Sequence, residues 1–238
     1  MTERVAVVTG GSRGIGRAIV SALLDDGWSV AYTYRTRGDE APAESDRCRA
    51  FALDLLDRDA PAAVVREIER VMGPVDGLVN NAGARHEALL AFTTDESWDN
   101  LLQINLGSAF RCCRAVLPSM MHRRRGVIVN VASLSALRGV AGQSAYAASK
   151  AALLGLSRAL AREAGKRNIR VNAVLPGFVQ TGMTEALSVD VVKALRSVEC
   201  LAQGTSAVNV ADAVAFLMSD KAAAITGQAI SVDAGASA

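Results

Sequence analysis

Short apolar stretches rich in β-branched residues alternate along the chain with longer amphipathic stretches. The short stretches have no polar face, which is typical of strands covered on both sides. The longer stretches have the 3.6-residue spacing of helices that bury one face. The predicted strands are residues 5–8, 29–34, 49–53, 75–79, 127–131, 169–174 and 230–232, and the predicted helices include 60–72, 96–122 and 146–165.

This alternation predicts an α/β fold, a doubly wound parallel sheet with helices on both faces. Because no internal repeat, low-complexity tract or linker interrupts the pattern, we expect residues 1–238 to form a single domain. The least regular stretch is 182–209, between the last two predicted strands. It is predicted to be a lid over a binding cleft, with a plain surface excursion as the alternative.

Composition excludes several classes of function. Half of the 238 residues are hydrophobic and the formal net charge is only +2, which gives no nucleic-acid footprint. The N-terminus carries no secretion signal, and no apolar run has membrane-spanning length. We therefore expect a cytoplasmic protein with no membrane or nucleic-acid partner. The cysteines, which lack metal-binding spacing and predict reduced thiols and no metal site, are Cys48, Cys112, Cys113 and Cys200.

A glycine-rich turn, Thr9–Gly16, directly follows the first predicted strand and opens a helix. Such a turn places free backbone N–H groups and the positive end of a helix against a pyrophosphate. Its spacing, G-x-x-x-G-x-G, differs from the more familiar G-x-G-x-x-G. The turn nevertheless predicts a dinucleotide site, and its candidate cofactor-binding residues are Gly10, Ser12, Arg13, Gly14, Ile15 and Gly16.

The end of the second strand indicates which dinucleotide is bound. An acidic residue about 20 residues after the glycine turn typically holds the ribose 2′-hydroxyl of NAD. Here the strand ends in Tyr34-Arg35, followed by Arg37, and Arg13 lies in the turn itself. Guanidinium groups offer paired donors to a 2′-phosphate, so the pattern favours NADP(H). The alternative is that these arginines are ordinary solvated loop charges.

Two further motifs end the third and fourth strands. Asp54-Leu55 places a carboxylate where it could accept a hydrogen bond from the adenine amino group. Asn80-Asn81-Ala82-Gly83 follows the fourth strand, so Asn81, Ala82 and Gly83 are also candidate cofactor contacts. Both motifs lie at the carboxyl edge of the predicted sheet, where ligands bind in open α/β folds. Alternatively, the asparagine pair only stabilises a turn.

The candidate chemistry lies on the predicted helix 146–165. Tyr146 and Lys150 are four residues apart, so their side chains share one helix face, roughly 5–6 Å apart at Cβ. An ammonium beside a phenol favours the phenolate, and we expect Lys150 to lower the pKa of Tyr146 from its ordinary value of about 10. Ser133, after the fifth strand, could hydrogen-bond a substrate carbonyl while Tyr146 delivers a proton.

Taken in order, these motifs resemble the short-chain dehydrogenase/reductase family over essentially the whole chain. The resemblance implies a single Rossmann-type domain and a catalytic tetrad of Asn105, Ser133, Tyr146 and Lys150. Tyr146 is then the general acid for ketone reduction, Lys150 also holds the nicotinamide ribose, and Asn105 holds a water that relays protons. The resemblance also implies a homotetramer packed through helices 96–122 and 146–165. The residues that it places at the nicotinamide carboxamide are Val179 and Thr181.

Within that family the chain is most similar to the 3-oxoacyl-[acyl-carrier-protein] reductases. The resemblance implies NADPH-dependent reduction of a 3-oxoacyl thioester, with Arg124 and Arg167 docking an acidic carrier protein. Residues 85–87 and 200–204 are unusual for the fatty-acid enzymes and leave a polyketide- or polyene-type pathway open. A reductase or dehydrogenase of a free small ketone or alcohol is the alternative. A non-catalytic NADP(H)-binding sensor is a second alternative.

Overall fold

Seven parallel strands form the sheet at the centre of the molecule, in the order β3-β2-β1-β4-β5-β6-β7. The computed structural model describes residues 4–182, 184 and 187–238, so residues 183, 185 and 186 of the predicted lid lie outside the described residues. The strands are β1 (Val5–Val8), β2 (Ser29–Tyr34), β3 (Cys48–Ala52), β4 (Val75–Asn80), β5 (Gly126–Val131), β6 (Ile169–Pro176) and β7 (Ala229–Val232).

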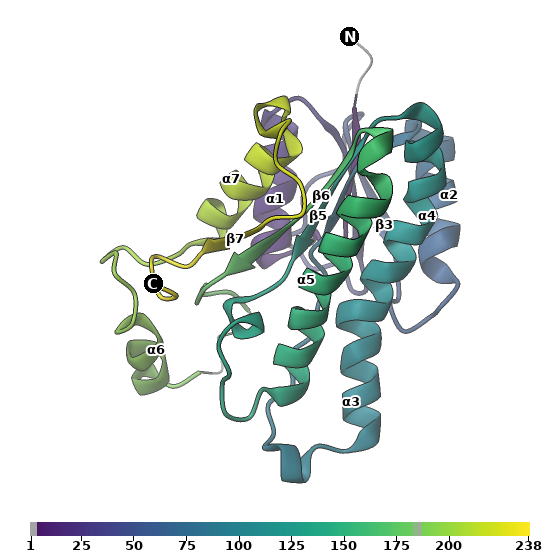
Figure 1. Ribbon diagram of the computed structural model, residues 1–238. Coiled ribbons are helices and arrows are strands. Elements are labelled where there is room, and N and C mark those ends of the chain that lie inside the picture. The colour runs from purple at the N-terminus through teal and green to yellow at the C-terminus, as the bar shows by residue number, and fades with distance from the viewer. Residues whose placement is uncertain (1–3, 183, 185–186) are drawn as a thin grey trace.

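Helices cover both faces of this sheet (Figure 1). On one face lie α1 (Gly14–Asp25) and α7 (Ala207–Met218). On the other face lie α2 (Ala60–Met72), α4 (Ser108–Arg123) and α5 (Ser144–Ala164). This arrangement confirms the predicted α/β fold with a doubly wound parallel sheet in a single domain. Among the described helices, none is both long and apolar enough to cross a membrane.

The hydrophobic core is divided by the sheet, and strand β1 shows how the sequence supplies both halves. Successive side chains of a strand point to opposite faces. Ala6 and Val8 accordingly pack in the cluster with α1 and α7, whereas Val5 and Val7 pack in the cluster with α2 and α4. All four side chains are buried. A strand that is apolar at every position therefore fits only a sheet covered on both sides.

The helical stretch predicted over 96–122 is divided into three parts in the structure. Helix α3 (Asp95–Leu102) is followed by a π-helical turn, η2 (Gln103–Gly107), before α4 begins. A π-turn adds a residue to the helical repeat and rotates the side chains within it, and such turns occur frequently at functional sites. The prediction located the helical residues correctly but missed the turn, which contains Asn105.

Two helices were not predicted from the sequence. Helix α7 is apolar on most of its surface and packs on α1, so its pattern lacks the polar stripe of an amphipathic helix. Helix α6 (Val189–Arg196) lies within the predicted lid and buries none of its residues. Its start is capped by the Ser188 hydroxyl, which accepts a hydrogen bond from the Val191 N–H at 3.4 Å.

The order of the strands makes the β1–β4 pair the topological switch point of the sheet. The chain fills the sheet outward from β1 to β3, then returns and continues from β4 to β7, so the winding direction reverses at this pair. Ligands of open α/β sheets bind outside the carboxyl ends of the strands at such a reversal. The glycine turn after β1 and the Asn80–Gly83 motif after β4 meet at this position.

Candidate active site

Three segments bring the four predicted tetrad residues together beyond the carboxyl ends of β4 and β5. Ser133 follows β5 and begins a short 3-10 turn, with its hydroxyl accepting from the Ser135 N–H at 3.1 Å. Tyr146 and Lys150 lie in the first two turns of α5. Asn105 reaches the same region from the π-turn.

Lys150 is buried deeply, with 4% of its surface exposed. Its Nζ donates a hydrogen bond to the Val131 carbonyl at 2.9 Å and lies 5.9 Å from the centroid of the Tyr146 ring. Burial lowers the pKa of Lys150 to about 8, because an ammonium loses hydration that one carbonyl only partly replaces. A Cβ on Gly83 would lie 3.3 Å from Nζ and 3.2 Å from the Asn105 Oδ1, so Gly83 leaves room for both groups.

The pKa of Tyr146 is raised above its ordinary value, mainly by burial. The Ser133 side chain and the charge of Arg85 oppose this rise. The expectation that Lys150 lowers the pKa is wrong for this state of the site. The reason is that burial of the phenol itself, the largest cause, outweighs the groups that favour the phenolate. A phenol that stays protonated near neutrality can act as a proton donor, which is the role required in carbonyl reduction.

Asn105 is held by its neighbours in a single orientation. Its Nδ2 donates to the Ala84 carbonyl and to the Ser149 Oγ, both at 3.0 Å, and its Oδ1 accepts from the Ala84 N–H at 2.8 Å. One acceptor position of Oδ1 is left. Ser149, whose hydroxyl also donates to the Tyr146 carbonyl, was not among the predicted site residues. Its position between Tyr146 and Lys150 in the chain was the available signal.

The glycine turn has the close backbone contacts that its sequence predicted. A Cβ on Gly16 would lie 2.1 Å from the Gly10 carbonyl oxygen, so no other residue fits there without a backbone shift. Gly10 has a φ of +65°, and a Cβ on it would lie 3.0 Å from the Ala82 Cα. The turn at the start of α1 is thus in direct backbone contact with the segment after β4. Backbone of this kind can approach a pyrophosphate closely.

The side chain of Asn81 supports this turn. Its Nδ2 donates to the carbonyls of Thr9 and Gly10, at 3.0 and 3.1 Å. The Thr9 hydroxyl in turn accepts from the N–H groups of Asn81 and Ala82, each at 3.0 Å. The turn-stabilising alternative therefore describes the contacts of Asn81. Direct contacts of Asn81, Ala82 and Gly83 with a cofactor stay a prediction.

Arginines surround the predicted position of the ribose, and they differ in their partners. Arg37 pairs with Glu44 at 2.7 Å, and Arg17 pairs with Glu40 at 3.1 Å. Arg13 and Arg35 are exposed and form no salt bridge within the described part of the chain. These two guanidinium groups are therefore the cations that remain for a phosphate.

The remaining predicted cofactor contacts lie at the same edge of the sheet. Asp54 is exposed after β3, and its Oδ1 accepts from the Leu56 N–H at 2.9 Å. The Leu55 carbonyl accepts from Gln103 Nε2 at 3.2 Å. Val179 is buried after β6, and a Cβ on Gly14 would lie 3.4 Å from the Thr181 Cγ2. The Thr181 segment thus lies across the glycine turn.

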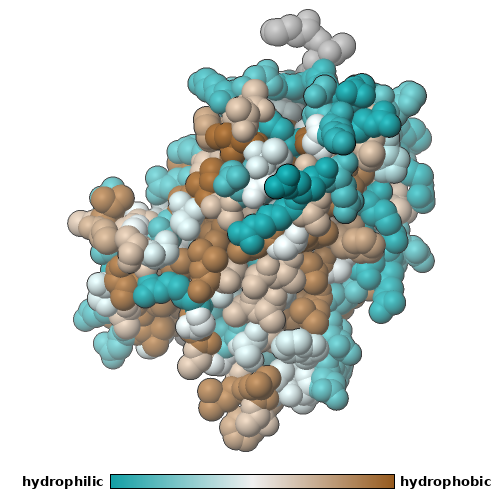
Figure 2. Space-filling model, in the orientation of Figure 1, coloured by the Kyte–Doolittle hydropathy of each residue, from teal (hydrophilic) through white to brown (hydrophobic). Residues whose placement is uncertain are grey.

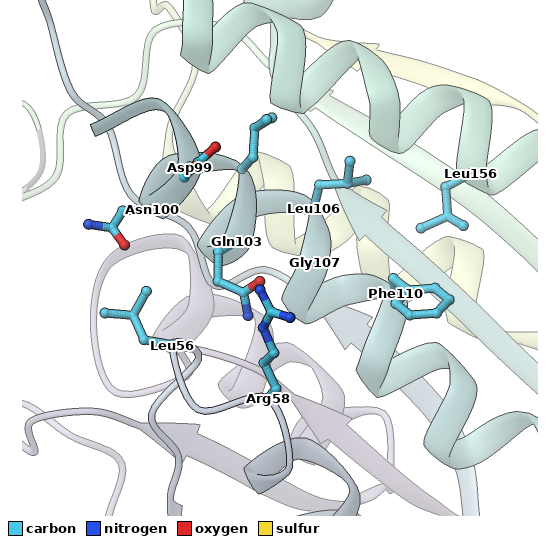
Figure 3. A pocket seen from close by; sticks show the side chains of 10 residues that line it. Leu56, Arg58, Asp99, Asn100, Gln103, Leu106, Gly107, Phe110 and Leu156 are labelled. Carbon is cyan, nitrogen blue, oxygen red and sulfur yellow. The ribbon is translucent and has the colours of Figure 1, made fainter. Parts of the chain in front are cut away.

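A surface hollow of about 790 Å³ lies away from the tetrad, beside α3, η2 and α4 (Figure 3). Gln103 and Arg58 extend toward each other within it, and Phe110 of α4 and Leu156 of α5 form its other side. Phe110 is 45% exposed, an unusual amount for an aromatic side chain. The hollow lies on the helices that the sequence analysis assigned to subunit packing.

Comparisons with known proteins find similar chains that this protein matches over almost its whole length. Residues 10–237 match the family described as Enoyl-(Acyl carrier protein) reductase. The 3-oxoacyl-[acyl-carrier-protein] reductase FabG of Escherichia coli (strain K12) is 42% identical over 236 residues, covering 98% of this chain and 96% of that protein. FabG of Staphylococcus aureus (strain Mu50 / ATCC 700699) is 38% identical over 237 residues, covering 97% and 96%. The crystal structure of gox2181 matches with a TM-score of 0.91 and 31% identity, covering 100% of this chain and 96% of that chain.

The low pKa of Lys150 makes stability depend on pH. Below about pH 8 the ammonium is charged in both the folded and unfolded states, and its burial destabilises the folded state. Between about pH 8 and 10.5 the folded state loses this proton first, so the destabilisation fades as pH rises. Relative to Lys150→Met, we expect the wild-type free energy of unfolding to increase by about 3 kcal/mol across that window.

Urea unfolding of both proteins at pH 7, 8, 9 and 10 measures this difference. Lys221→Met is the control, because an exposed ammonium keeps its water in both states. A wild-type-to-variant difference that stays constant with pH contradicts the prediction.

Proposed function

This chain belongs to the short-chain dehydrogenase/reductase family, and we propose that it reduces the 3-oxo group of an acyl thioester carried on an acyl carrier protein. It is an oxidoreductase that acts on a C=O/CH–OH pair, with NADP(H) as its cofactor. One observation carries the proposal: Ser133, Tyr146 and Lys150 assemble next to a glycine turn at the reversal point of the sheet. The names of the curated relatives support the substrate class.

Each tetrad residue has a role that its surroundings support. NADPH, when bound, supplies the hydride for the carbonyl carbon. The Ser133 hydroxyl orients the carbonyl oxygen, and Tyr146 donates the proton that this oxygen takes up. Lys150 provides a positive charge beside the phenol and a donor for the nicotinamide ribose. Asn105, through its remaining acceptor position, holds a water between Lys150 and bulk solvent.

The cofactor lies across the contact between the glycine turn and the segment after β4. The missing side chains of Gly10 and Gly16 leave backbone accessible to the pyrophosphate. Arg13 and Arg35 hold the 2′-phosphate, while Ser12 and Ile15 present N–H groups of the turn. Asp54 and Leu55 contact the adenine, Asn81 to Gly83 the adjoining ribose, and Val179 and Thr181 the carboxamide.

The segment 182–209 forms a lid over the substrate. Helix α6 buries none of its residues, so it can move without opening the core. The far end of the segment is tied down, because the N–H groups of Cys200 and Leu201 donate to the Ala234 carbonyl at 2.8 and 3.0 Å. The guanidinium of Arg196, at the end of α6, lies 5.7 Å from the ring centroid of Phe178, which precedes the segment. The lid then closes by rotating about the two ends of this segment.

The proposed carrier-docking arginines lie at the opposite end of the molecule from Tyr146. Arg124 Nη2 donates to the Lys166 carbonyl at 3.0 Å, which places Arg124 beside Arg167. Tyr146 lies near the start of α5, and about 27 Å of helix at 1.5 Å per residue separates it from the end of α5 at Ala164, beyond which Arg167 lies. A carrier protein docked on these arginines therefore serves the active site of a neighbouring subunit.

A homotetramer packed through α4 and α5 supplies that neighbour. Two copies of a helix related by a two-fold axis across it run antiparallel, so the end of α5 in one subunit approaches the start of α5 in the other. Figure 2 shows apolar surface reaching the middle of the face over α5, with hydrophilic surface gathered toward the top and right. The exposed Phe110 and the hollow beside it support burial of this face.

Fatty-acid and polyketide-type synthesis both produce the proposed substrate by condensation of acyl thioesters. A free small ketone or alcohol as substrate is the alternative that uses the same tetrad. A sensor that binds NADP(H) without turnover is the second alternative, and the assembled proton-donor site argues against it, since a sensor needs no buried tyrosine next to a lysine.

The first prediction from the proposed function concerns the cofactor. The double variant Arg13→Ser with Arg35→Ser is expected to weaken NADPH binding about tenfold or more while changing NADH binding little, because the two cofactors differ in the 2′-phosphate. Fluorescence titration gives both Kd values. Arg47→Ser, which removes an exposed arginine before β3, is the control. Wild-type protein that binds NADH as tightly as NADPH contradicts the assignment.

The second prediction tests the reaction. NADPH oxidation is expected with a 3-oxobutyryl thioester, and Tyr146→Phe is expected to lower kcat about 100-fold or more with NADPH binding retained. Among the described residues, the Tyr32 hydroxyl bonds only the Pro42 carbonyl, at 2.8 Å, so Tyr32→Phe is expected to keep turnover. The enoyl thioester and a panel of free ketones complete the comparison. Absence of turnover with every substrate favours the sensor, and preference for a free ketone favours the first alternative.

The third prediction tests carrier docking. Arg124→Glu with Arg167→Glu is expected to lower kcat/KM for the carrier-bound substrate about tenfold or more and to spare a small thioester, because only the carrier contacts the arginines. Arg47→Glu with Arg66→Glu changes the net charge equally and is the control. Equal losses on both substrates argue against docking at this surface, and sedimentation reports whether the tetramer persists.

A further inference from the structure

A group of hydrogen-bonded side chains links the loop after β4 to both halves of the catalytic site. The guanidinium of Arg85 is bonded to the Glu87 carboxylate. Gln143 Nε2 donates to the same Glu87 oxygen, Oε1, at 2.8 Å. Gln143 is 6% exposed, so this polar contact is largely shielded from water. Glu87 is therefore held from two sides, and it holds Arg85 in turn.

Gln143 connects this group to the tetrad. It immediately precedes α5, and its backbone carbonyl accepts from the Ala147 N–H at 2.8 Å in the first turn of the helix. Its Oε1 accepts from the Ser135 hydroxyl at 3.2 Å, and the Ser135 N–H donates to the Ser133 Oγ at 3.1 Å. The position of Arg85 is therefore coupled to the segments that carry Ser133 and Tyr146.

Arg85 retains a donor that no described part of the chain satisfies. Only 18% of the side chain is exposed, and its buried Nε has no hydrogen-bond partner among the described residues. A buried donor without an acceptor is costly, so a ligand oxygen that accepted a hydrogen bond from it would remove this cost. Its charge also favours the Tyr146 phenolate, as expected of a guanidinium coupled to the same segments.

A 3-oxoacyl thioester has two carbonyl groups, the thioester carbonyl at C1 and the ketone at C3, with one carbon between them. Ser133 and Tyr146 account for the oxygen at C3. We propose that Arg85 is a specificity-determining residue whose guanidinium hydrogen-bonds the thioester carbonyl oxygen, so that the site selects 1,3-dicarbonyl substrates over isolated ketones. This inference rests on the proposed function. The Glu87–Gln143 contact fixes the guanidinium for that role, since an anchored fork loses little conformational entropy on binding.

The test compares two substrates in two variants. Arg85→Gln removes the charge, whereas Arg85→Lys keeps the charge and loses the planar fork. With a 3-oxobutyryl thioester, kcat/KM is expected to fall about 10- to 100-fold in Arg85→Gln and less in Arg85→Lys. With an isolated ketone of similar size, both variants are expected to stay within about threefold of wild type. Arg66→Gln, at an exposed position of α2, is the control.

The outcomes separate this inference from the proposed function. Wild-type turnover of the thioester tests the function, and the ratio of variant to wild type on the two substrates tests Arg85. If the thioester is reduced equally well by Arg85→Gln, the function stands and the inference is overturned. Equal losses on both substrates also overturn it, since they indicate a general structural role; thermal unfolding and NADPH titration check that the variants are folded.

Discussion

The contact between the turn after β1 and the segment after β4 is the constraint on which the rest of the site depends. Gly10 approaches Ala82 so closely that a Cβ on it would lie 3.0 Å from the Ala82 Cα, and its φ of +65° disfavours any other residue. Asn81 and Ala82 donate three hydrogen bonds to Thr9, which join the same two segments. The segment then continues to Gly83, which leaves space for Asn105 and Lys150. One backbone contact therefore aligns the cofactor crevice with the proton-donor site.

Burial determines the chemistry of the tetrad more than pairing does. Lys150 is enclosed with one carbonyl partner, and its pKa falls to about 8, while Tyr146 is enclosed and its pKa rises. Both shifts favour the neutral form, as desolvation requires. A tyrosine that holds its proton suits reduction of a carbonyl. A bound cofactor and substrate change the solvation of Lys150 and Tyr146, and the pKa values of both groups change with it.

The two edges of the sheet carry different parts of the proposed function. The carboxyl edge carries the cofactor crevice, the tetrad and the group around Arg85, all built from segments that leave successive strands. The amino edge carries Arg124 beside Lys166 and Arg167, at the far ends of α4 and α5. Because a helix of 21 residues separates these edges, carrier docking and catalysis are linked only if subunits pack side by side. Assembly is then part of the proposed function.

The sequence by itself determined the strands, the parallel sheet and the position of the glycine turn, because continuous apolar runs and backbone-demanding glycines leave few alternatives. It also located Ser133, Tyr146 and Lys150 as a group, since helical spacing and strand ends are local features. Only the tertiary structure showed the π-turn at Asn105, the direction of the Tyr146 pKa shift and the links from Arg85 to Gln143. These depend on enclosure and on contacts between residues far apart in the chain, which no local pattern encodes.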